Sequence, residues 1–412
     1  MISFKEAQKL IEENDSLPKK TEEVFISAAL GYVNASDIKS PLELPCYDNS
    51  AMDGFILRSE DTLNATAQDP VFLDIRGAIK AGDHLTVTLG KKETYKIMTG
   101  ASVIRGGNTV IPKEKTAVEG NFLIVREPVT KGGNIRFKGE EIKKSELVLP
   151  EGSVINPGTI GFLATMGIKK IQVYKKPKIS LIATGNELIA PGNPLRPGKI
   201  YDSNTSMVQA ALDEMRIRPV FARRLDDKPK IIRRIIDFAL RESDIVILMG
   251  GVSVGDYDYV KDQLAKAGIE TIFWKVSQKP GKPIYFGKKG NKLVFGLPGN
   301  PASVFTCFYE YVYPAIRRTM GYRNPYLLSE KLPLKTPLKP DPEKLLFIKS
   351  KIEYNGVKTI VPLKHQKSHM ISSLCMADSF MVVPCSDKMI EKDESVLVHS
   401  LPYALESAGL PV

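Results

Sequence analysis

Apolar residues recur at helical spacing at the start of the chain, at Phe4, Ala7, Leu10 and Ile11. This spacing places them on one face of a helix. Ser3 and Glu6, at the start of this segment, have the spacing of a capping box, in which each side chain hydrogen-bonds to the other residue's backbone N–H. The pattern predicts an amphipathic helix at the N-terminus.

The hydrophobic pattern changes to short alternating segments between about residues 44 and 150. Residues 71–75 and 122–125 are examples, and Gly and Pro separate such segments. Alternation over four to eight residues, bounded by turn residues, is typical of half-buried strands. We therefore expect a small β-rich region, inserted into a helical one that resumes near Asn156.

Strand-like and helix-like patterns alternate between Pro177 and Met320. The apolar strand runs are residues 179–183, 245–249, 269–274 and 293–297. Helical spacing is found over 204–215, from Pro229 to Leu240, through Val260 and Leu264, and from Pro301 towards Met320, with a bend expected at Pro314. This alternation predicts a doubly wound α/β domain, a parallel sheet with helices on both faces. A separate C-terminal β domain is expected from about Tyr326 to Val412.

Composition places the chain among multidomain globular proteins, with 412 residues, 43% apolar and 25% charged. No apolar run is long enough for a secretory signal or a membrane span, so we expect a cytoplasmic protein. The four cysteines are far apart and are expected to be reduced and mostly in the core. The four histidines form no zinc-ligand cluster. A net charge of +11 without an aromatic-interleaved basic helix favours a solvated basic surface or an anionic small substrate over nucleic acid.

Three Gly-rich loops follow three of the predicted strands. They are Thr184-Gly-Asn-Glu-Leu188, Gly250-Gly-Val-Ser-Val-Gly-Asp-Tyr-Asp-Tyr259 and Gly296-Leu-Pro-Gly-Asn-Pro301. Glycine lets the backbone approach a ligand closely, and N–H groups at a helix start bind anions. One such loop is as readily a tight turn, but three at one sheet edge favour a phosphate-bearing ligand. The expected phosphate contacts are Gly250, Gly251, Ser253, Gly255, Pro298, Gly299, Asn300, Pro301 and Ser303.

Charged residues accompany these loops. The carboxylates are Glu187, Asp226 or Asp227, and Asp258, and the cations are Lys275, Lys279 and Lys282. Carboxylates beside phosphate are a common way to hold Mg²⁺, which prefers oxygen ligands. We expect Mg²⁺ on Glu187 and Asp258, and a second anion at the lysines, although each lysine alone is as readily a solvated surface residue.

Six motifs together resemble the signature set of the molybdopterin molybdenumtransferase (MoeA) family, which includes the C-terminal domain of gephyrin. Besides the three loops, they are Asp48-Asn-Ser-Ala-Met-Asp-Gly54, Ile97-Met-Thr-Gly-Ala101 and Lys279-Pro-Gly-Lys-Pro283. They occur in family order and cover essentially the whole chain. A doubly wound domain alone would also fit molybdopterin adenylyltransferases, but the first of these motifs would not.

The resemblance implies four domains in each chain of an elongated homodimer. They are a discontinuous linker and dimerisation domain at 1–43 and 140–176, a β-rich domain at 44–139, a doubly wound domain similar to the adenylyltransferase MogA at 177–325, and a C-terminal β-barrel-like domain at 326–412. It implies a cleft between subunits that Asp53 and Thr99 reach from the partner chain. Departures from the family pattern at Asn186, Glu141 and Ser145 weaken the transfer of the motif Gly139-Glu-Glu-Ile142.

The resemblance also assigns roles within the doubly wound domain. Glu187, Asp226 and Asp258 are similar to the carboxylates that handle the metal and the adenylate. Lys275 and Lys279 are similar to the lysines for molybdate and the substrate's phosphate, and Pro298 and Pro301 shape the phosphate loop. A segment of the C-terminal domain, Ser368-His-Met-Ile-Ser-Ser373, resembles the family's Ser-rich loop.

The implied activity is insertion of molybdate into adenylylated molybdopterin with release of AMP, dependent on Mg²⁺. We expect transient contact with the preceding adenylyltransferase. We do not expect binding to nucleic acid or to a membrane. The alternatives are the adenylylation step itself, an insertase that prefers tungstate, and a binding scaffold like gephyrin. Molybdate and tungstate are tetrahedral dianions of nearly equal size, so the sequence does not choose between them.

Overall fold

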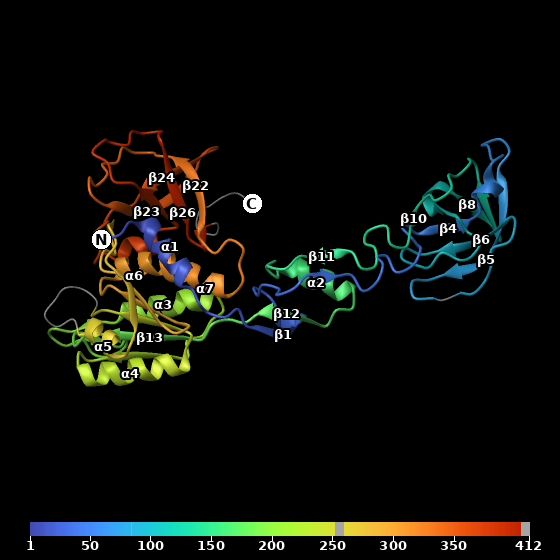
Figure 1. The fold of residues 1–412 in the computed structure, drawn as a ribbon. Helices are drawn as coiled ribbons and strands as arrows, with labels where there is room; N and C mark the ends of the chain where they lie inside the picture. The colour runs from blue at the N-terminus through green and yellow to red at the C-terminus, as the bar shows by residue number, and fades with distance from the viewer. Residues whose placement is uncertain (84, 252–258, 405–412) are drawn as a thin grey trace. The chain divides into compact units, whose positions relative to one another are not determined.

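The structure, a computed structural model, describes residues 1–83, 85–251 and 259–404 (Figure 1). The chain divides into two compact units. The larger unit comprises Met1–Ala35, Gly152–Ile160 and Lys170–Val412, and the smaller comprises Ser36–Glu151 and Gly161–Lys169. None of the helices in the described ranges is long and apolar enough to span a membrane. The finer division into four domains stays a prediction.

A six-stranded sheet lies at the centre of the larger unit, in the order β16-β13-β17-β21-β20-β18. Its strands are β13 (Ile179–Thr184), β16 (Phe221–Leu225), β17 (Ile245–Met249), β18 (Glu270–Trp274), β20 (Tyr285–Lys289) and β21 (Lys292–Leu297). The four strands from β16 to β21 are parallel, as the sequence predicts for β13, β17 and β21, whereas β16 was not predicted. Strand β20 was not predicted, and it pairs antiparallel with both β21 and β18. Only two residues connect β20 to β21, which suffices for a hairpin but not for a crossover.

Helices cover both faces of this sheet (Figure 1). On one face are α4 (Pro229–Glu242) and α5 (Val260–Lys266). The other face packs against α1 (Phe4–Asn14), α3 (Ser203–Glu214), α6 (Pro301–Cys307) and α7 (Tyr313–Thr319). A π-helical turn, Phe308–Val312, separates α6 from α7, and Pro314 lies in the first turn of α7. The bend expected at Pro314 stays a prediction.

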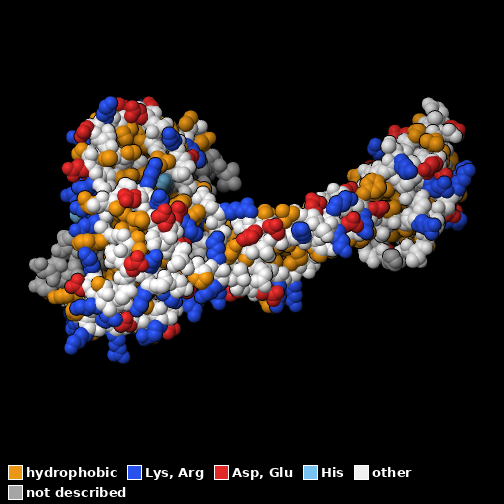
Figure 2. Space-filling model, viewed as in Figure 1, with side chains coloured by type: hydrophobic (Ala, Val, Ile, Leu, Met, Phe, Trp, Pro, Cys, Tyr) orange, Lys and Arg blue, Asp and Glu red, His pale blue; other side chains and the backbone are white. Residues whose placement is uncertain are grey.

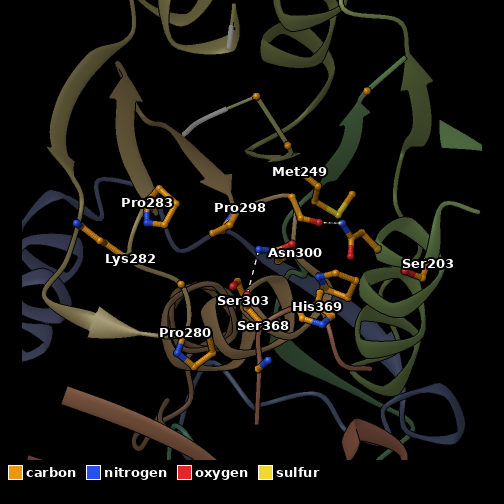
Figure 3. A pocket seen from close by; sticks show the side chains of 18 of the residues that line it. Ser203, Met249, Pro280, Lys282, Pro283, Pro298, Asn300, Ser303, Ser368 and His369 are labelled. Atoms are coloured by element: carbon orange, nitrogen blue, oxygen red, sulfur yellow. Dashed lines mark hydrogen bonds between the residues drawn. The ribbon is translucent and has the colours of Figure 1, made fainter. Parts of the chain in front are cut away.

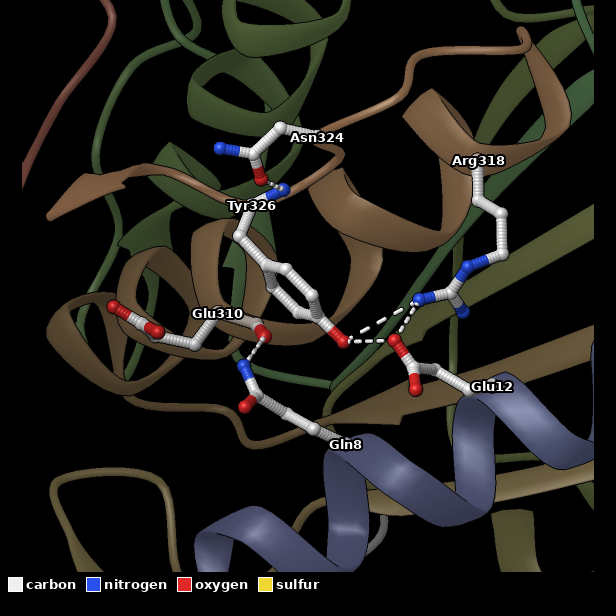
Figure 4. Close-up of polar contacts among 6 residues, drawn as sticks. All are labelled: Gln8, Glu12, Glu310, Arg318, Asn324 and Tyr326. Carbon is white, nitrogen blue, oxygen red and sulfur yellow. Dashed lines mark hydrogen bonds and ion pairs between the residues drawn. The ribbon is translucent and has the colours of Figure 1, made fainter.

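Helix α1 begins with the predicted capping box and packs into the core of the larger unit. The ring of Phe4 meets the edges of Tyr311 and Phe347, with centroids 5.7 and 5.1 Å away. On its polar side, Gln8 Nε2 donates to the Glu310 carbonyl at 3.3 Å. Glu12 accepts hydrogen bonds from both Arg318 and Tyr326 (Figure 4). This network ties the N-terminal helix to α7 and to the start of the C-terminal segment.

The C-terminal segment of the larger unit forms a second six-stranded sheet. Its strands are β22 (Leu328–Pro333), β23 (Leu345–Tyr354), β24 (Lys358–Pro362), β25 (Ser379–Val383), β26 (Ser395–Ser400) and the short β19 (Gln278–Lys279), with η5 (Ser372–Cys375) before β25. The order is β19-β23-β25-β26-β22, and β24 pairs with β23. A bridge between Leu334 and Ile360 also brings the end of β22 beside β24, so the sheet curls towards closure. Because β19 belongs to the lysine motif, that motif is hydrogen-bonded to the C-terminal sheet.

The smaller unit is built around a sheet of order β7-β4-β6-β5-β9-β8. Its strands are β4 (Gly54–Leu57), β5 (Val71–Ile79), β6 (Glu93–Ile97), β7 (Thr109–Pro112), β8 (Ala117–Glu119) and β9 (Phe122–Val125). The pairs β2 (Ile38–Lys39) with β11 (Leu147–Leu149), and β3 (Asn49–Ser50) with β10 (Ile135–Arg136), extend the unit. Turns η2 (Ser59–Thr62) and η3 (Lys113–Lys115) complete it. Apolar clusters lie on both faces of the sheet, so the predicted β-rich region has its own core.

The remaining elements are short. They are β1 (Thr21–Phe25), which pairs with β12 (Lys170–Tyr174), the pair β14 (Leu188–Ile189) and β15 (Ile200–Tyr201), η1 (Ile26–Ala28) and α2 (Pro157–Thr165), which the sequence predicts from Asn156 onward. On the face shown in Figure 2, Lys and Arg side chains lie among Asp and Glu.

The cysteines do not follow the sequence prediction. Cys307 is buried, but Cys46, Cys375 and Cys385 are exposed, and all four are free thiols. The prediction that they are mostly in the core is therefore wrong. The three exposed cysteines lie outside the strands and α-helices, whereas Cys307 lies in α6.

Candidate functional site

A cavity of about 830 Å³ lies at the carboxyl ends of β13, β17 and β21, where ligands bind in open α/β sheets. The three Gly-rich loops line it, together with the lysine motif and a loop of the C-terminal segment (Figure 3). The predicted site residues that it brings together are Glu187, Gly250, Gly251, Lys279, Lys282, Pro298, Gly299, Asn300, Pro301 and Ser303. All of them belong to the larger unit.

Backbone amides form one wall of this cavity. Gly250 and Gly251 have φ values of 89° and 65°, the left-handed region that favours glycine. A Cβ at Gly250 would lie 2.6 Å from the Thr184 carbonyl oxygen. Among the described residues, the N–H groups of Gly251, Gly299 and Asn300 have no hydrogen-bond acceptor. These amides are therefore available to an anionic ligand.

The N-terminus of α6 is already occupied. The Ala302 N–H donates to the carbonyl oxygen of Ser368 at 3.1 Å. Asn300 Nδ2 donates to the Ser368 hydroxyl at 3.1 Å (Figure 3). An anion at this corner would therefore meet the loop amides of Gly299 and Asn300, and not the amide of Ala302. Ser368 lies in the predicted Ser-rich loop, which thus becomes part of the cavity wall.

Cations predominate among the charged side chains of the cavity. Lys279 and Lys282 come from the lysine motif, and the C-terminal segment adds Lys344 and Lys367. The carboxylate of Glu187 folds back over Gly185, where an added Cβ would lie 2.7 Å from either carboxylate oxygen. No described side chain or amide donates to this exposed carboxylate, so it is free to bind a cation.

Two predicted residues lie outside the cavity lining. Asp226 forms an exposed ion pair with Lys228 at 3.4 Å, whereas its neighbour Asp227 lines the cavity. Asp227 and Asn186 exchange hydrogen bonds of 3.1 and 3.0 Å, each donating its N–H to the other's side chain. The ammonium of Lys275 lies 3.8 Å from the centroid of the Trp274 ring. Lys275 therefore makes a cation–π contact with Trp274, and it is not among the residues that line the cavity.

Three further predicted residues, Ser253, Gly255 and Asp258, lie outside the described residues. Within the described ranges, no group of three or more His, Cys, Asp or Glu side chains is arranged to hold a metal ion. Because one of the two predicted Mg²⁺ ligands is Asp258, the described residues do not decide the Mg²⁺ prediction.

Asp53 and Thr99 form a pair in the smaller unit, a contact that the sequence does not predict. The N–H and hydroxyl of Thr99 both donate to Asp53 Oδ1 at 2.8 Å. These two hydrogen bonds, the backbone bond first, lower the pKa of Asp53 below its ordinary value of 3.8. Asp53 is therefore a carboxylate at neutral pH, held in one orientation by the neighbouring strand end.

Sequence reasoning missed several lining residues, among them Thr184 in this role, Asn204, Gln278, Gln366 and His369. Asn204 Nδ2 donates to the Gly299 carbonyl at 2.8 Å and so supports the loop. Its Oδ1 and the hydroxyl of Thr184 are buried without a partner among the described residues. In the sequence, the segment Tyr201-Asp-Ser-Asn204 indicates only the start of a helix, and Asp202 is indeed the N-cap of α3. Nothing in this segment indicates that Asn204 would line a ligand site.

Known relatives share most of this chain. It is 31% identical over 411 residues to the molybdopterin molybdenumtransferase of Haemophilus influenzae, covering 98% of this chain and 100% of that protein. The chain belongs to the molybdopterin molybdenumtransferase family. It is also 33% identical over 368 residues to molybdopterin molybdenumtransferase 2 of Mycobacterium tuberculosis, covering 88% of this chain and 90% of that protein.

Three family models match successive parts of the chain. They are the MoeA N-terminal region (domain I and II) over residues 2–167, the probable molybdopterin binding domain over 180–318 and the MoeA C-terminal region (domain IV) over 331–401. The crystal structure of a molybdopterin biosynthesis MoeA protein from Pyrococcus horikoshii OT3 superimposes with a TM-score of 0.82 at 30% identity, over 97% of this chain and 100% of that one. The predicted family and multidomain fold are confirmed.

Proposed function

We propose that this chain is a molybdopterin molybdenumtransferase that inserts molybdate into adenylylated molybdopterin and releases AMP. Transferase activity in molybdenum cofactor synthesis follows from its membership of the family. The observation that carries the proposal is the cavity, where open loop amides, four lysines and a free carboxylate converge at the ends of β13, β17 and β21.

The amide wall suits the phosphate link of the adenylate. The wall contains the N–H groups of Gly251, Gly299 and Asn300, which have no acceptor among the described residues. Backbone N–H groups bind phosphate oxygens without being protonated or deprotonated. Lys279 and Lys282 supply positive charge at the same cavity. An oxygen nucleophile, from molybdate or from water, attacks the adenylate phosphorus, and the phosphate–phosphate link breaks to leave AMP and the molybdopterin phosphate. The lysines hold molybdate as the second anionic substrate.

Magnesium is part of the proposal, with Glu187 and Asp258 as its ligands. The free, exposed carboxylate of Glu187 beside the phosphate wall fits a cation that prefers oxygen donors and keeps several waters. When bound, Mg²⁺ neutralises charge that develops on phosphate oxygens. The chain's own residues fix the phosphate, while Lys199 and Asp227 hold the loop residue Asn186.

The remaining elements of the proposal come from the family. We propose a cytoplasmic homodimer in which Asp53 and Thr99 of one chain serve the cavity of its partner. Transient contact with the adenylyltransferase delivers the labile adenylate. The fixed carboxylate of Asp53 supports this role, because its orientation is set by two hydrogen bonds before any substrate binds.

The decisive experiment incubates the purified chain with adenylylated molybdopterin, Mg²⁺ and molybdate, and measures AMP and the activity of an apo-molybdoenzyme reconstituted with the product. AMP release that requires molybdate supports the proposal. Formation of adenylate from free molybdopterin and ATP would instead identify the preceding step. A parallel titration with tungstate determines which oxyanion the chain prefers.

A further inference from the structure

A lysine is buried beside the cavity without lining it. Lys349, on β23, is 1% exposed, and a lysine is almost never this buried unless its charge is compensated. Its Nζ donates to the carbonyl oxygens of His365 at 2.7 Å and Met370 at 3.1 Å. No carboxylate of the described residues lies within ion-pairing distance of it. Two loop carbonyls therefore hold this charge.

Both carbonyls belong to one segment, residues 364–373, here called the wall loop. Further bonds fasten it to β23, since Gln366 accepts from the Lys349 N–H at 3.0 Å and donates to the Lys349 carbonyl at 2.8 Å. The Ser373 hydroxyl donates to the His365 carbonyl at 3.0 Å. His365 has a φ of 64°, so the loop turns sharply at the point where the lysine holds it.

The opposite side of the wall loop faces the substrate cavity. Gln366, Lys367, Ser368 and His369 all line it. Ser368 also bonds to Asn300 and to the Ala302 amide at the start of α6. The wall loop is thus fastened on one side to the C-terminal sheet by Lys349 and on the other to the phosphate loop.

We propose that Lys349 is a positioning residue, whose buried ammonium sets the wall loop and thereby the C-terminal side of the substrate site. It acts through the loop and not as a ligand, because its ammonium is directed at the two carbonyls. A neutral side chain would remove the donor to the Met370 carbonyl and would leave the His365 carbonyl with the Ser373 hydroxyl as its remaining donor. The loop would then open more often, because it loses the two hydrogen bonds by which the Lys349 side chain holds it to β23.

The first test does not depend on the proposed function. Amide hydrogen exchange is compared between Lys349→Met and Lys351→Met, which removes the same charge two residues along β23 but has no bond to the wall loop. In Lys349→Met we expect exchange at least about tenfold faster, equivalent to about 1.4 kcal/mol, in peptides covering 363–373 and at the Ala302 amide. Exchange in β25 stays unchanged. Unaltered exchange in the wall loop would overturn the proposal.

The second test rests on the proposed function and uses steady-state AMP release. Lys349→Met is expected to raise the KM for molybdate roughly tenfold with kcat retained, because the loop samples its working position less often. Lys349→Arg, which keeps a charged donor, restores much of the difference. A fall in kcat at unchanged KM, or a raised KM without faster loop exchange, contradicts the positioning role.

The two tests fail separately. If the wild-type chain releases no AMP, the proposed function is wrong, while hydrogen exchange still decides whether Lys349 holds the wall loop. If Lys349→Met does not fold, Lys349→Gln, which keeps a shorter neutral donor, replaces it in the exchange experiment, with the same expected loss of protection in the loop.

Discussion

Asp53 is held in one orientation by its neighbour Thr99. Its lowered pKa arises from the two bonds from Thr99, so their stabilising effect is present above the ordinary carboxyl pKa and is lost as pH falls through the lowered one. Thr99→Val keeps the backbone bond and removes the hydroxyl bond. We expect the pKa of Asp53 to rise towards 3.8, measured by NMR titration of the carboxyl carbon. Thr99→Ser is the matched control, and an equal rise in both variants would contradict this account.

Lys279 provides a second prediction for a single residue. It lines the cavity, and a charge-assisted hydrogen bond contributes about 1.5–3 kcal/mol. Lys279→Ala should therefore raise the molybdate concentration for half-maximal AMP release roughly tenfold or more. Lys266→Ala, which removes an exposed lysine on α5, should leave that concentration unchanged. An unaltered requirement in Lys279→Ala removes this lysine from the oxyanion site.

Individual side chains were predictable where a motif fixes the backbone, as at Gly250 and Lys279. They were not predictable where neighbours in sequence face different ways. Asp226 points to solvent while Asp227 lines the cavity, and no pattern separates two adjacent acids in a loop. Lys349 carries no motif signal, because its role depends on a loop that reaches it only in the folded C-terminal sheet.

At the scale of elements, α1 is the clearest case of a helix whose stability comes from packing. Phe4 is 7% exposed and contacts two aromatic rings. Phe4→Ala should lower the free energy of unfolding by about 3–5 kcal/mol. Urea denaturation measures this change. The single tryptophan, Trp274, reports on the larger unit. Lys5→Ala, at an exposed position of the same helix, should change the free energy of unfolding by less than about 0.5 kcal/mol.

Elements with a strong period were predicted well, and those without one were missed. The capping box of α1 and Pro229 at the start of α4 matched their signals. Strand β20 was missed because Gly287 and two lysines interrupt its apolar pattern. Its burial is supplied by β18 and β21 on either side, which a reading of local period does not detect.

For the whole molecule, the family motifs predicted more than periodicity did. Periodicity alone indicates a doubly wound domain between β-rich regions, and the two units and their sheets agree with that. It does not indicate that β19 joins the C-terminal sheet, so that Lys279 is positioned by pairing with Leu346. Pairings this far apart in sequence leave no local signal.

The proposed sharing of the active site between subunits makes a prediction for the assembled dimer. Asp53→Ala and Glu187→Gln chains carrying different tags are co-expressed, and heterodimers are purified through both tags. If Asp53 serves the partner's cavity, one site of each heterodimer has both residues intact, and about half of the wild-type AMP release is expected. If both residues serve their own chain, the heterodimer is inactive.

The reciprocal heterodimer decides between the two arrangements with opposite outcomes. It joins a wild-type chain to a chain carrying both Asp53→Ala and Glu187→Gln. Shared sites then each lack one residue, so this heterodimer is inactive, whereas sites within one chain would leave about half of the activity. Because the same two substitutions are present in both heterodimers, a general loss of stability lowers both activities alike, and only the location of Asp53 reverses their order.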